Sequence, residues 1–364
     1  MNDALTPLDG ALLERFDALR PAAITSVCDR FYGTHGSIYQ RFGPKGRERC
    51  REDLAFLLEF LRPVLEFGLV ETMVEYLSWL RSVLAARAIP GDHVLLSLEW
   101  VGQFLALSME PADARKVGLA VRDVAARLAQ APETPAVAPL PDAPWPEAKA
   151  FETALLSGSQ RGAAAIVDRS LADGRGLVDV EMGIIQPSLY HVGEQWQANL
   201  VSVAQEHMAT AIARAVMTNA LLNSAPPASK HKRVLLACVE GNHHGLGLHM
   251  VADAFQLNGW DVQYLGADVP NNALVKQALA WEADLVGLSV SFAQQAHAVR
   301  EAIALLAAER GAARPPVFVG GLAINRFDVL AKLLGADAHF ADARSAAAGA
   351  ERITTRKDGA LLRA

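Results

Sequence analysis

Short apolar runs alternate with helical repeats over the last third of the chain. Five apolar runs predict strands, at residues 234–239, 262–265, 285–290, 317–319 and 339–341. Between them, apolar side chains recur at helical spacing and predict helices at residues 248–257, 273–280, 294–308 and 326–334. This alternation is typical of a parallel sheet with helices on both faces. Residues 231–350 are therefore expected to form a doubly wound α/β domain.

The pattern immediately upstream of the sheet is helical. Residues 148–225 hold four predicted helices, enough to close a small bundle, at residues 148–156, 162–172, 178–197 and 203–222. Ser202 and Gln205 form a capping box at the start of the last of these helices. We expect this bundle to precede the sheet directly.

The first 130 residues are also helical in pattern. Helices are expected at residues 94–109 and 117–128, and across residues 53–84 in two parts divided near Pro63 and Gly68. Residues 32–46 are rich in glycine and aromatic side chains and predict an ordered loop. A globin-like or bundle domain over residues 1–130 fits this pattern. Six prolines within residues 131–147 then predict an extended linker.

Composition narrows the classes of function. The chain has 364 residues and a formal net charge of −6, which argues against nucleic-acid binding as its main activity. It has no apolar run long enough to span a membrane and no signal-peptide pattern. Its three scattered cysteines suit a reducing compartment. We therefore expect a cytoplasmic protein with no membrane or nucleic-acid partner.

The loop after the first predicted strand carries the candidate chemistry. Residues 240–247 read EGNHHGLG and follow a strand end, where open α/β sheets bind ligands. A phosphate-binding loop is disfavoured because neither the G-x-G-x-x-G spacing nor a P-loop lysine is present. From the residues alone, two interpretations stay open: a structural histidine and a metal ligand.

The frame Asn242-x-His244-x-x-Gly247 resembles the D/E-x-H-x-x-G signature of cobalamin-binding domains. This resemblance implies that His244 binds cobalt from below, in place of the cofactor's own base, with His243 and Gly245 beside it. Asn242 stands where the family has an acidic residue that tunes the histidine. In a flavodoxin-like strand order, small residues after the third and fourth strands would leave a slot for the ligand: Ser289, Ser291, Gly320 and Gly321. The other interpretation is that they only permit tight packing.

A second motif lies in the predicted bundle. Trp196, nine residues and then Glu206-His207 give W-x9-E-H, which resembles the light-sensing cobalamin proteins of the CarH type over roughly residues 148–349. The resemblance implies that the bundle caps adenosylcobalamin: Trp196 packs on the adenosyl group, Glu206 hydrogen-bonds it and His207 orients the upper face of the corrin. Light would break the cobalt–carbon bond and shift the bundle against the sheet.

One position departs from the CarH pattern. Gln197 stands where those proteins have a histidine that captures cobalt after illumination, so His191 or His207 would have to substitute. The resemblance also implies a homo-oligomer, expected to be a dimer, whose assembly changes with light. The sequence does not indicate the downstream effector.

The front domain lacks the basic reading helix of a DNA-binding head and resembles that of the photocobilins, in which a degraded globin-like domain binds biliverdin. Residues 50–53, Cys-Arg-Glu-Asp, are loosely similar to the C-x-R-D run of bilin-binding phycobiliproteins, with the arginine one place early. The resemblance implies a bilin site that includes His35, Tyr39, Arg49, Arg51 and Asp53. The alternative is a solvated, charged helix start.

Two other functions use the same bundle and sheet. A corrinoid carrier of a methyltransferase system needs an open upper face, so a roof of Trp196, Glu206 and His207 argues against it. A mutase subunit would need a substrate barrel, for which this chain has no room. We therefore expect a sensor without catalysis of its own.

Overall fold

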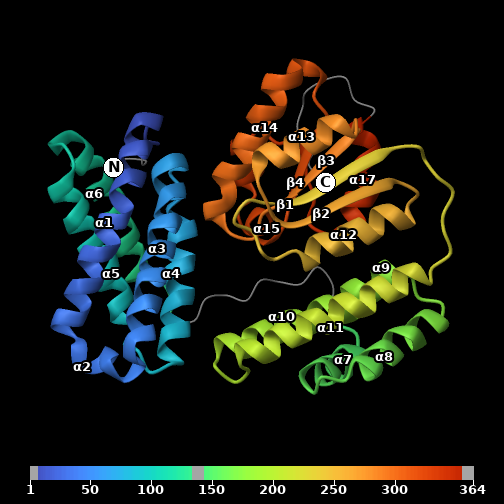
Figure 1. Cartoon of the computed structure of the whole chain (residues 1–364), viewed down its shortest axis with the longest axis horizontal. Helices are drawn as coiled ribbons and strands as arrows, with labels where there is room; N and C mark the ends of the chain where they lie inside the picture. The colour runs from blue at the N-terminus through green and yellow to red at the C-terminus, as the bar shows by residue number, and fades with distance from the viewer. Residues whose placement is uncertain (1–6, 133–142, 355–364) are drawn as a thin grey trace. The chain divides into compact units, whose positions relative to one another are not determined.

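The structure is a computed structural model that describes residues 7–132 and 143–354 (Figure 1). The chain divides into two compact units, Met1–Val137 and Ala138–Ala364. The described part of the first unit is helical, with α1 (Gly10–Thr34), α2 (Gly36–Tyr39), a 3-10 turn η1 (Gln40–Phe42), α3 (Gly43–Phe67), α4 (Val70–Ala85), α5 (Asp92–Ser108) and α6 (Pro111–Leu128). No helix of the described residues is both long and apolar enough to cross a membrane.

The division between α3 and α4 follows the sequence prediction. Gly68 ends α3 in the left-handed conformation, with φ of 73°, while Pro63 lies inside the helix. The prediction of a loop at residues 32–46 is wrong, because α1 extends to Thr34 and two short helical turns lead directly to Gly43. Gly36 and Gly43 begin helical elements instead of opening a loop. The likeness of this unit to a globin stays a prediction.

The predicted linker, residues 131–147, lies partly outside the described residues, because Pro135, Pro139 and Pro141 fall in the stretch 133–142. Its end is fixed on the bundle: the Trp145 N–H donates to the Gly183 carbonyl at 2.9 Å. A Cβ added at Gly183 would lie 2.6 Å from the Trp145 ring, so glycine is needed for this contact.

The bundle of the second unit begins directly after this contact. Its helices are α7 (Glu147–Leu156), α8 (Gln160–Ala172), α9 (Leu177–Val180), a π-helical segment η2 (Glu181–Ile185), α10 (Gln186–Gln197) and α11 (Val203–Leu222). The capping box at Ser202 and Gln205 is confirmed. The predicted helix 178–197 is therefore continuous but contains a π-helical turn. Pro187 has no N–H for the Gly183 carbonyl, which accepts from Trp145 instead.

Five parallel strands follow in the spatial order β2-β1-β3-β4-β5, which confirms the expected flavodoxin-like order. The strands are β1 (Arg233–Val239), β2 (Asp261–Val269), β3 (Leu285–Ser289), β4 (Val317–Gly320) and β5 (Ala338–His339). The helices are α12 (Leu246–Leu257), α13 (Asn271–Ala280), α14 (Ala296–Arg310), α15 (Leu322–Arg326), α16 (Val329–Leu333) and α17 (Ala343–Thr354), with 3-10 turns η3 (Ala293–Gln295) and η4 (Gly311–Ala313). The helix predicted at 326–334 corresponds to α16, and α15 and α17 were not predicted.

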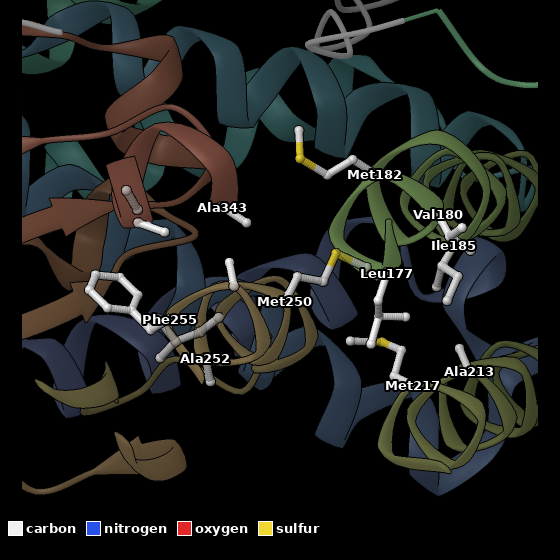
Figure 2. Packing of buried hydrophobic residues seen from close by; sticks show 14 of the residues in the cluster. Leu177, Val180, Met182, Ile185, Ala213, Met217, Met250, Ala252, Phe255 and Ala343 are labelled. Carbon is white, nitrogen blue, oxygen red and sulfur yellow. The ribbon is translucent and has the colours of Figure 1, made fainter. Parts of the chain in front are cut away.

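The bundle and the sheet share one hydrophobic core. Helix α12 packs with α17 on one face of the sheet, and α13 packs with α14 on the other (Figure 1). Figure 2 shows where the bundle meets α12, in an apolar layer that includes Leu177, Val180, Met182, Ile185, Ala213, Met217, Met250, Ala252, Phe255 and Ala343. Burial of this layer removes apolar surface from water and fixes the bundle on α12.

Candidate functional site

The loop after β1 is held in place by backbone and side-chain hydrogen bonds. Asn242 is fully buried; its Nδ2 donates to the Ser289 carbonyl at 2.9 Å, and its Oδ1 accepts from the His244 N–H at 3.1 Å. Gln295 Nε2 donates to the Gly241 carbonyl at 2.9 Å. Asn242 therefore ties this loop to the end of the neighbouring strand β3. Its amide bonds the His244 backbone, which is a structural use that the sequence motif did not indicate.

The side chain of His244, two residues after Asn242, is exposed. Its ring meets the Phe292 ring edge-on, with 5.1 Å between centroids and an interplanar angle of 80°. Surrounding protein lowers the pKa of His244; the Glu206 carboxylate acts in the opposite direction, and His243 lowers the pKa further. The imidazole is therefore neutral at neutral pH, which is the form that binds a metal. Phe292 was not predicted, although it directly follows Ser291.

The small residues around His244 play two different roles. A Cβ added at Gly247 would meet nothing within 4 Å, so the first turn of α12 borders open space. Gly321 has φ of 101°, and an added Cβ would lie 2.6 Å from the Val290 carbonyl oxygen. Gly321 is thus required for the close approach of the loops after β3 and β4. A Cβ at Gly320 would lie 3.0 Å from the Phe340 carbonyl oxygen, which is also tight.

The remaining predicted residues of this slot lie at the ends of the central strands. Ser289 is buried at the end of β3, and its carbonyl receives the bond from Asn242. The Ser291 N–H donates to Gln295 Oε1 at 3.0 Å. His243 is exposed beside His244, and the Gly245 carbonyl accepts from the Tyr264 hydroxyl at 2.8 Å. The structure therefore places these residues together on the carboxyl edge of the sheet.

The bundle contributes three side chains from the end where α10 turns into α11. Trp196 is half-buried in the last turn of α10, and Glu206 is half-buried in the first turn of α11. Glu206 accepts from the Thr210 hydroxyl at 3.0 Å and contacts Nδ1 of the exposed His207. The charge of Glu206 acts on the pKa of His244, so the start of α11 and the loop after β1 lie close to one another. Glu206 of the second motif thus acts on His244 of the first, while a site shared with Trp196 and His207 stays a prediction.

His191 is engaged elsewhere in the bundle. Its Nδ1 lies 2.6 Å from Oε2 of the buried Glu152, whose other oxygen accepts from Lys149 and Gln195, each at 2.8 Å. Burial raises the pKa of Glu152, but hydrogen bonds from Lys149, His191 and Gln195 outweigh it, so the pKa lies below its usual value. Of the two histidines expected to replace the one missing at Gln197, His207 is thus the one beside Glu206.

A second cluster lies within the N-terminal unit. The Tyr39 hydroxyl lies 2.7 Å from His93 Nδ1, and the His35 and His93 rings stand 4.5 Å apart. Asp53 is exposed; surrounding protein, and then the charge of Glu52, raise its pKa to about 6 against the lowering effects of Arg49 and Arg87. Asp53 in turn contributes to raising the pKa of Tyr39, after burial and Cys50. Asp53 therefore acts on Tyr39 electrostatically, while a shared site for these residues stays a prediction.

The predicted cations are less well placed. Arg49 pairs with Glu52 at 3.3 Å, and the Arg51 side chain is exposed. A cavity of about 540 Å³ lies elsewhere in this unit and was not predicted; it is lined by Arg81, Ser82, Ala85, Gly91, Asp92, Leu95, Leu128 and Ala129. The sequence signal for it was slight, because only the Pro90-Gly91 turn marks the region.

Family comparisons agree with the site in the second unit. Residues 232–351 match a family described as "B12 binding domain", and residues 147–220 match a second family of the same description. The two matches cover the sheet domain and most of the bundle.

Curated relatives fall into two groups. The chain is 33% identical over 153 residues to the HTH-type transcriptional repressor CarH of Myxococcus xanthus (42% of this chain, 50% of that protein). It is 36% identical over 160 residues to the repressor CarA of the same organism (43% and 52%). It is also 30% identical over 136 residues to dimethylamine corrinoid protein 3 of Methanosarcina acetivorans (36% and 63%).

The chain spans about half the length of the two repressors it matches. A solved monomethylamine corrinoid protein of Methanosarcina barkeri is 22% identical, with a TM-score of 0.48, over 56% of this chain and 96% of that one. The family matches and the likeness to the two repressors support a cobalamin-binding module similar to that of CarH in the bundle and sheet.

Proposed function

We propose that this protein is a light sensor that binds adenosylcobalamin between the bundle and the sheet. The observation that carries the proposal is that one B12-binding family match falls on the bundle, with Trp196 and Glu206, and another on the sheet domain, with His244. The Glu206 carboxylate of the bundle acts on the pKa of His244 in the sheet domain, and open space borders the first turn of α12 at Gly247. A ligand held there would contact both parts at once. Its loss would therefore change how the bundle rests on the sheet.

The residues present fit this cofactor. Neutral, exposed His244 offers a lone pair from the sheet side, and Asn242 fixes the backbone that carries it. On the bundle side, Trp196 would supply apolar area for a nucleoside, and Glu206 would accept hydrogen bonds from its hydroxyl or amino groups. His207 would lie at the edge of the same roof. When bound, adenosylcobalamin would supply a cobalt–carbon bond that green light breaks.

A corrinoid carrier is the second candidate, and the dimethylamine corrinoid relatives favour it. A carrier must expose its upper face to a methyltransferase, whereas a sensor must cover that face.

The exposed apolar side chains Leu200 and Val203 lie at the α10–α11 turn, 75% and 54% exposed. They give a sensor an apolar surface at the roof that a second copy would cover, consistent with an assembly that changes with light.

Illumination separates these two functions. The full chain loaded with adenosylcobalamin in the dark should show a new bound-corrin spectrum after green light, together with a changed elution volume in size-exclusion chromatography. The expected reason is that loss of the adenosyl group empties the space beside Trp196. Methylcobalamin-loaded chain is the control and should elute like the illuminated sample. Equal elution of all samples, with no preference for adenosylcobalamin, would favour the carrier.

We also propose that the N-terminal unit binds a bilin beside Tyr39, His93 and Asp53. The support is the aromatic and histidine cluster, together with the exposed Asp53, whose charge acts on Tyr39. A bilin presents pyrrole N–H groups that a carboxylate can accept. His35 lies in the same cluster, while Arg49 and Arg51 would have to turn inward to reach the propionates.

Bilin binding should strengthen as the pH rises through about 6, because the Asp53 carboxyl then becomes a carboxylate. Titration of the full chain with biliverdin, followed by red absorbance at pH 5 and pH 7.5, measures this. Asp53→Asn should remove the pH dependence, whereas Glu52→Gln should keep it with a lower midpoint, because the Glu52 charge contributes to raising the pKa of Asp53. Unchanged absorbance in Asp53→Asn would remove this carboxyl from the site.

A further inference from the structure

Two carboxyl groups face each other where the bundle meets the sheet domain. Glu181 is the first residue of η2, and Asp253 lies on α12; both are fully buried. Their chain neighbours Val180, Met182 and Ala252 belong to the apolar layer in Figure 2. Among the described residues, no other group donates a hydrogen bond to any of the four carboxyl oxygens. Such a pair of buried acids is costly unless a proton is present.

Two carboxylates cannot bond to each other, because each is only an acceptor. One proton turns them into an acid–carboxylate pair, which is a strong hydrogen bond. Burial, and then the charge of Asp253, raise the pKa of Glu181 well above its usual value. Burial also raises the pKa of Asp253, although Glu181 and His249 oppose this. Burial and the lack of another donor to either carboxyl among the described residues therefore favour retention of the proton while the junction is closed.

The other ionisable groups around the pair do not replace this proton. His249 Nε2 lies 3.6 Å from Asp253 Oδ1, too long for a hydrogen bond. Arg344 of α17 is paired with Asp179 of α9 at 2.7 Å. The packed elements also carry Tyr264 of β2, Cys238 of β1 and Arg214 of α11, whose charge acts on the other two. Other charged groups on these elements are Glu206 and His207 of α11, Asp261 and Asp268 of β2, Arg233 of β1, and Glu351 and Arg352 of α17.

The pair is also connected to the loop that carries His244. The His249 ring stacks on Tyr264, with 5.3 Å between centroids and 9° between planes. The Tyr264 hydroxyl donates to the Gly245 carbonyl, directly after His244. A displacement of Asp253 would thus reach that loop through two packed rings.

We propose that Glu181 and Asp253 share one proton that fastens the bundle on α12. Opening of the junction exposes both carboxyls to water, where they ionise, so opening releases this proton and is favoured by alkaline pH. The fastening needs no cofactor. Its use in a light response rests on the proposed function, in which loss of the adenosyl group opens the same junction and would release the proton.

Hydrogen exchange of the cofactor-free full chain tests the proposal. We would follow peptides covering η2 and α12 between pH 6 and pH 9 in the wild type and in Glu181→Gln. Comparison at one pH cancels the intrinsic pH dependence of exchange. The side-chain amide that this substitution introduces can donate to Asp253 without a titrating proton, so wild-type opening should rise relative to the variant by up to about tenfold per pH unit. A constant ratio between the two chains would overturn the proposal.

Two further chains keep the test decisive. Asp253→Asn places the amide on the other side and should flatten the pH dependence in the same way. Glu152→Gln is the matched control, a buried bundle carboxyl with its own donors, and should leave the pH dependence of η2 and α12 unchanged. If neither amide variant folds, the wild type alone still tests the proposal. Its exchange rate in η2 and α12 must rise more steeply with pH than its exchange rate in α14. Equal pH dependence in the two regions would contradict the proposal. Because no cobalamin is present, failure here leaves the light-sensor proposal standing.

Discussion

His244→Ala is expected to abolish imidazole ligation of cobalt and to weaken cobalamin binding at least about tenfold. Loss of a residue that only supports a metal ligand usually costs about 10–100-fold in affinity, so loss of the ligand itself should cost no less. The fold should persist, because the side chain is exposed and Asn242 bonds the backbone of residue 244. Paramagnetic resonance of the reduced cobalt form measures the ligation as nitrogen splitting from a protein imidazole.

His243→Ala is the matched control, since it removes a neighbouring imidazole that is also exposed. It should keep the nitrogen splitting. Splitting that survives His244→Ala and disappears in His243→Ala would assign the metal to His243. The ligand frame would then be shifted by one residue.

Trp196→Ala should weaken adenosylcobalamin binding relative to methylcobalamin. Removing a fully buried Trp costs about 3–5 kcal/mol. Trp196 is half-buried without the ligand, so we expect a loss of about 1–3 kcal/mol, on the order of tenfold to a hundredfold in affinity. Methylcobalamin has no nucleoside above cobalt and should lose less.

Titration of the dark protein with both cobalamins measures this preference. Trp281→Ala is the matched control, because Trp281 is also half-buried but caps α13 in the sheet domain. It should change neither affinity selectively. If Trp196→Ala leaves the preference for adenosylcobalamin unaltered, Trp196 does not line the adenosyl pocket. That outcome would not affect the assignment of His244 as the cobalt ligand.

Local pattern was sufficient to predict the sheet. The central strands β1 and β3 are mostly apolar and alternate with helical repeats, so a parallel sheet and the loop that carries His244 follow from connectivity rules, although β2 and β5 also contain polar residues. Pattern failed at residues 32–46, where Gly36 and Gly43 indicated a loop but begin helical turns. Glycine is compatible with both structures, and packing against the neighbouring helices decides between them.

The candidate site was predictable where one motif places several residues on one loop. Asn242 and His244 are such a case. The hydrogen bond from the buried Asn242 amide to the Ser289 carbonyl was not predictable, because Ser289 belongs to another strand. Glu181 and Asp253 lie far apart in the sequence, and each reads alone as an ordinary surface acid. Only their packing across the junction makes them a buried pair. The cavity beside Arg81 likewise depends on how three helices meet.

The π-helical turn at Glu181–Ile185 has a consequence for the direction of everything after it. Such a turn is equivalent to one residue inserted into an α-helix, which rotates the downstream part by about 100°. Trp196 therefore points where it does because of an offset that arises several turns earlier. The offset is maintained where Pro187 leaves the Gly183 carbonyl to Trp145. Trp145, just before the bundle, thus helps to set the direction in which Trp196 points. A change in the segment that leads into the bundle would therefore also reorient the side chains of the proposed cofactor pocket.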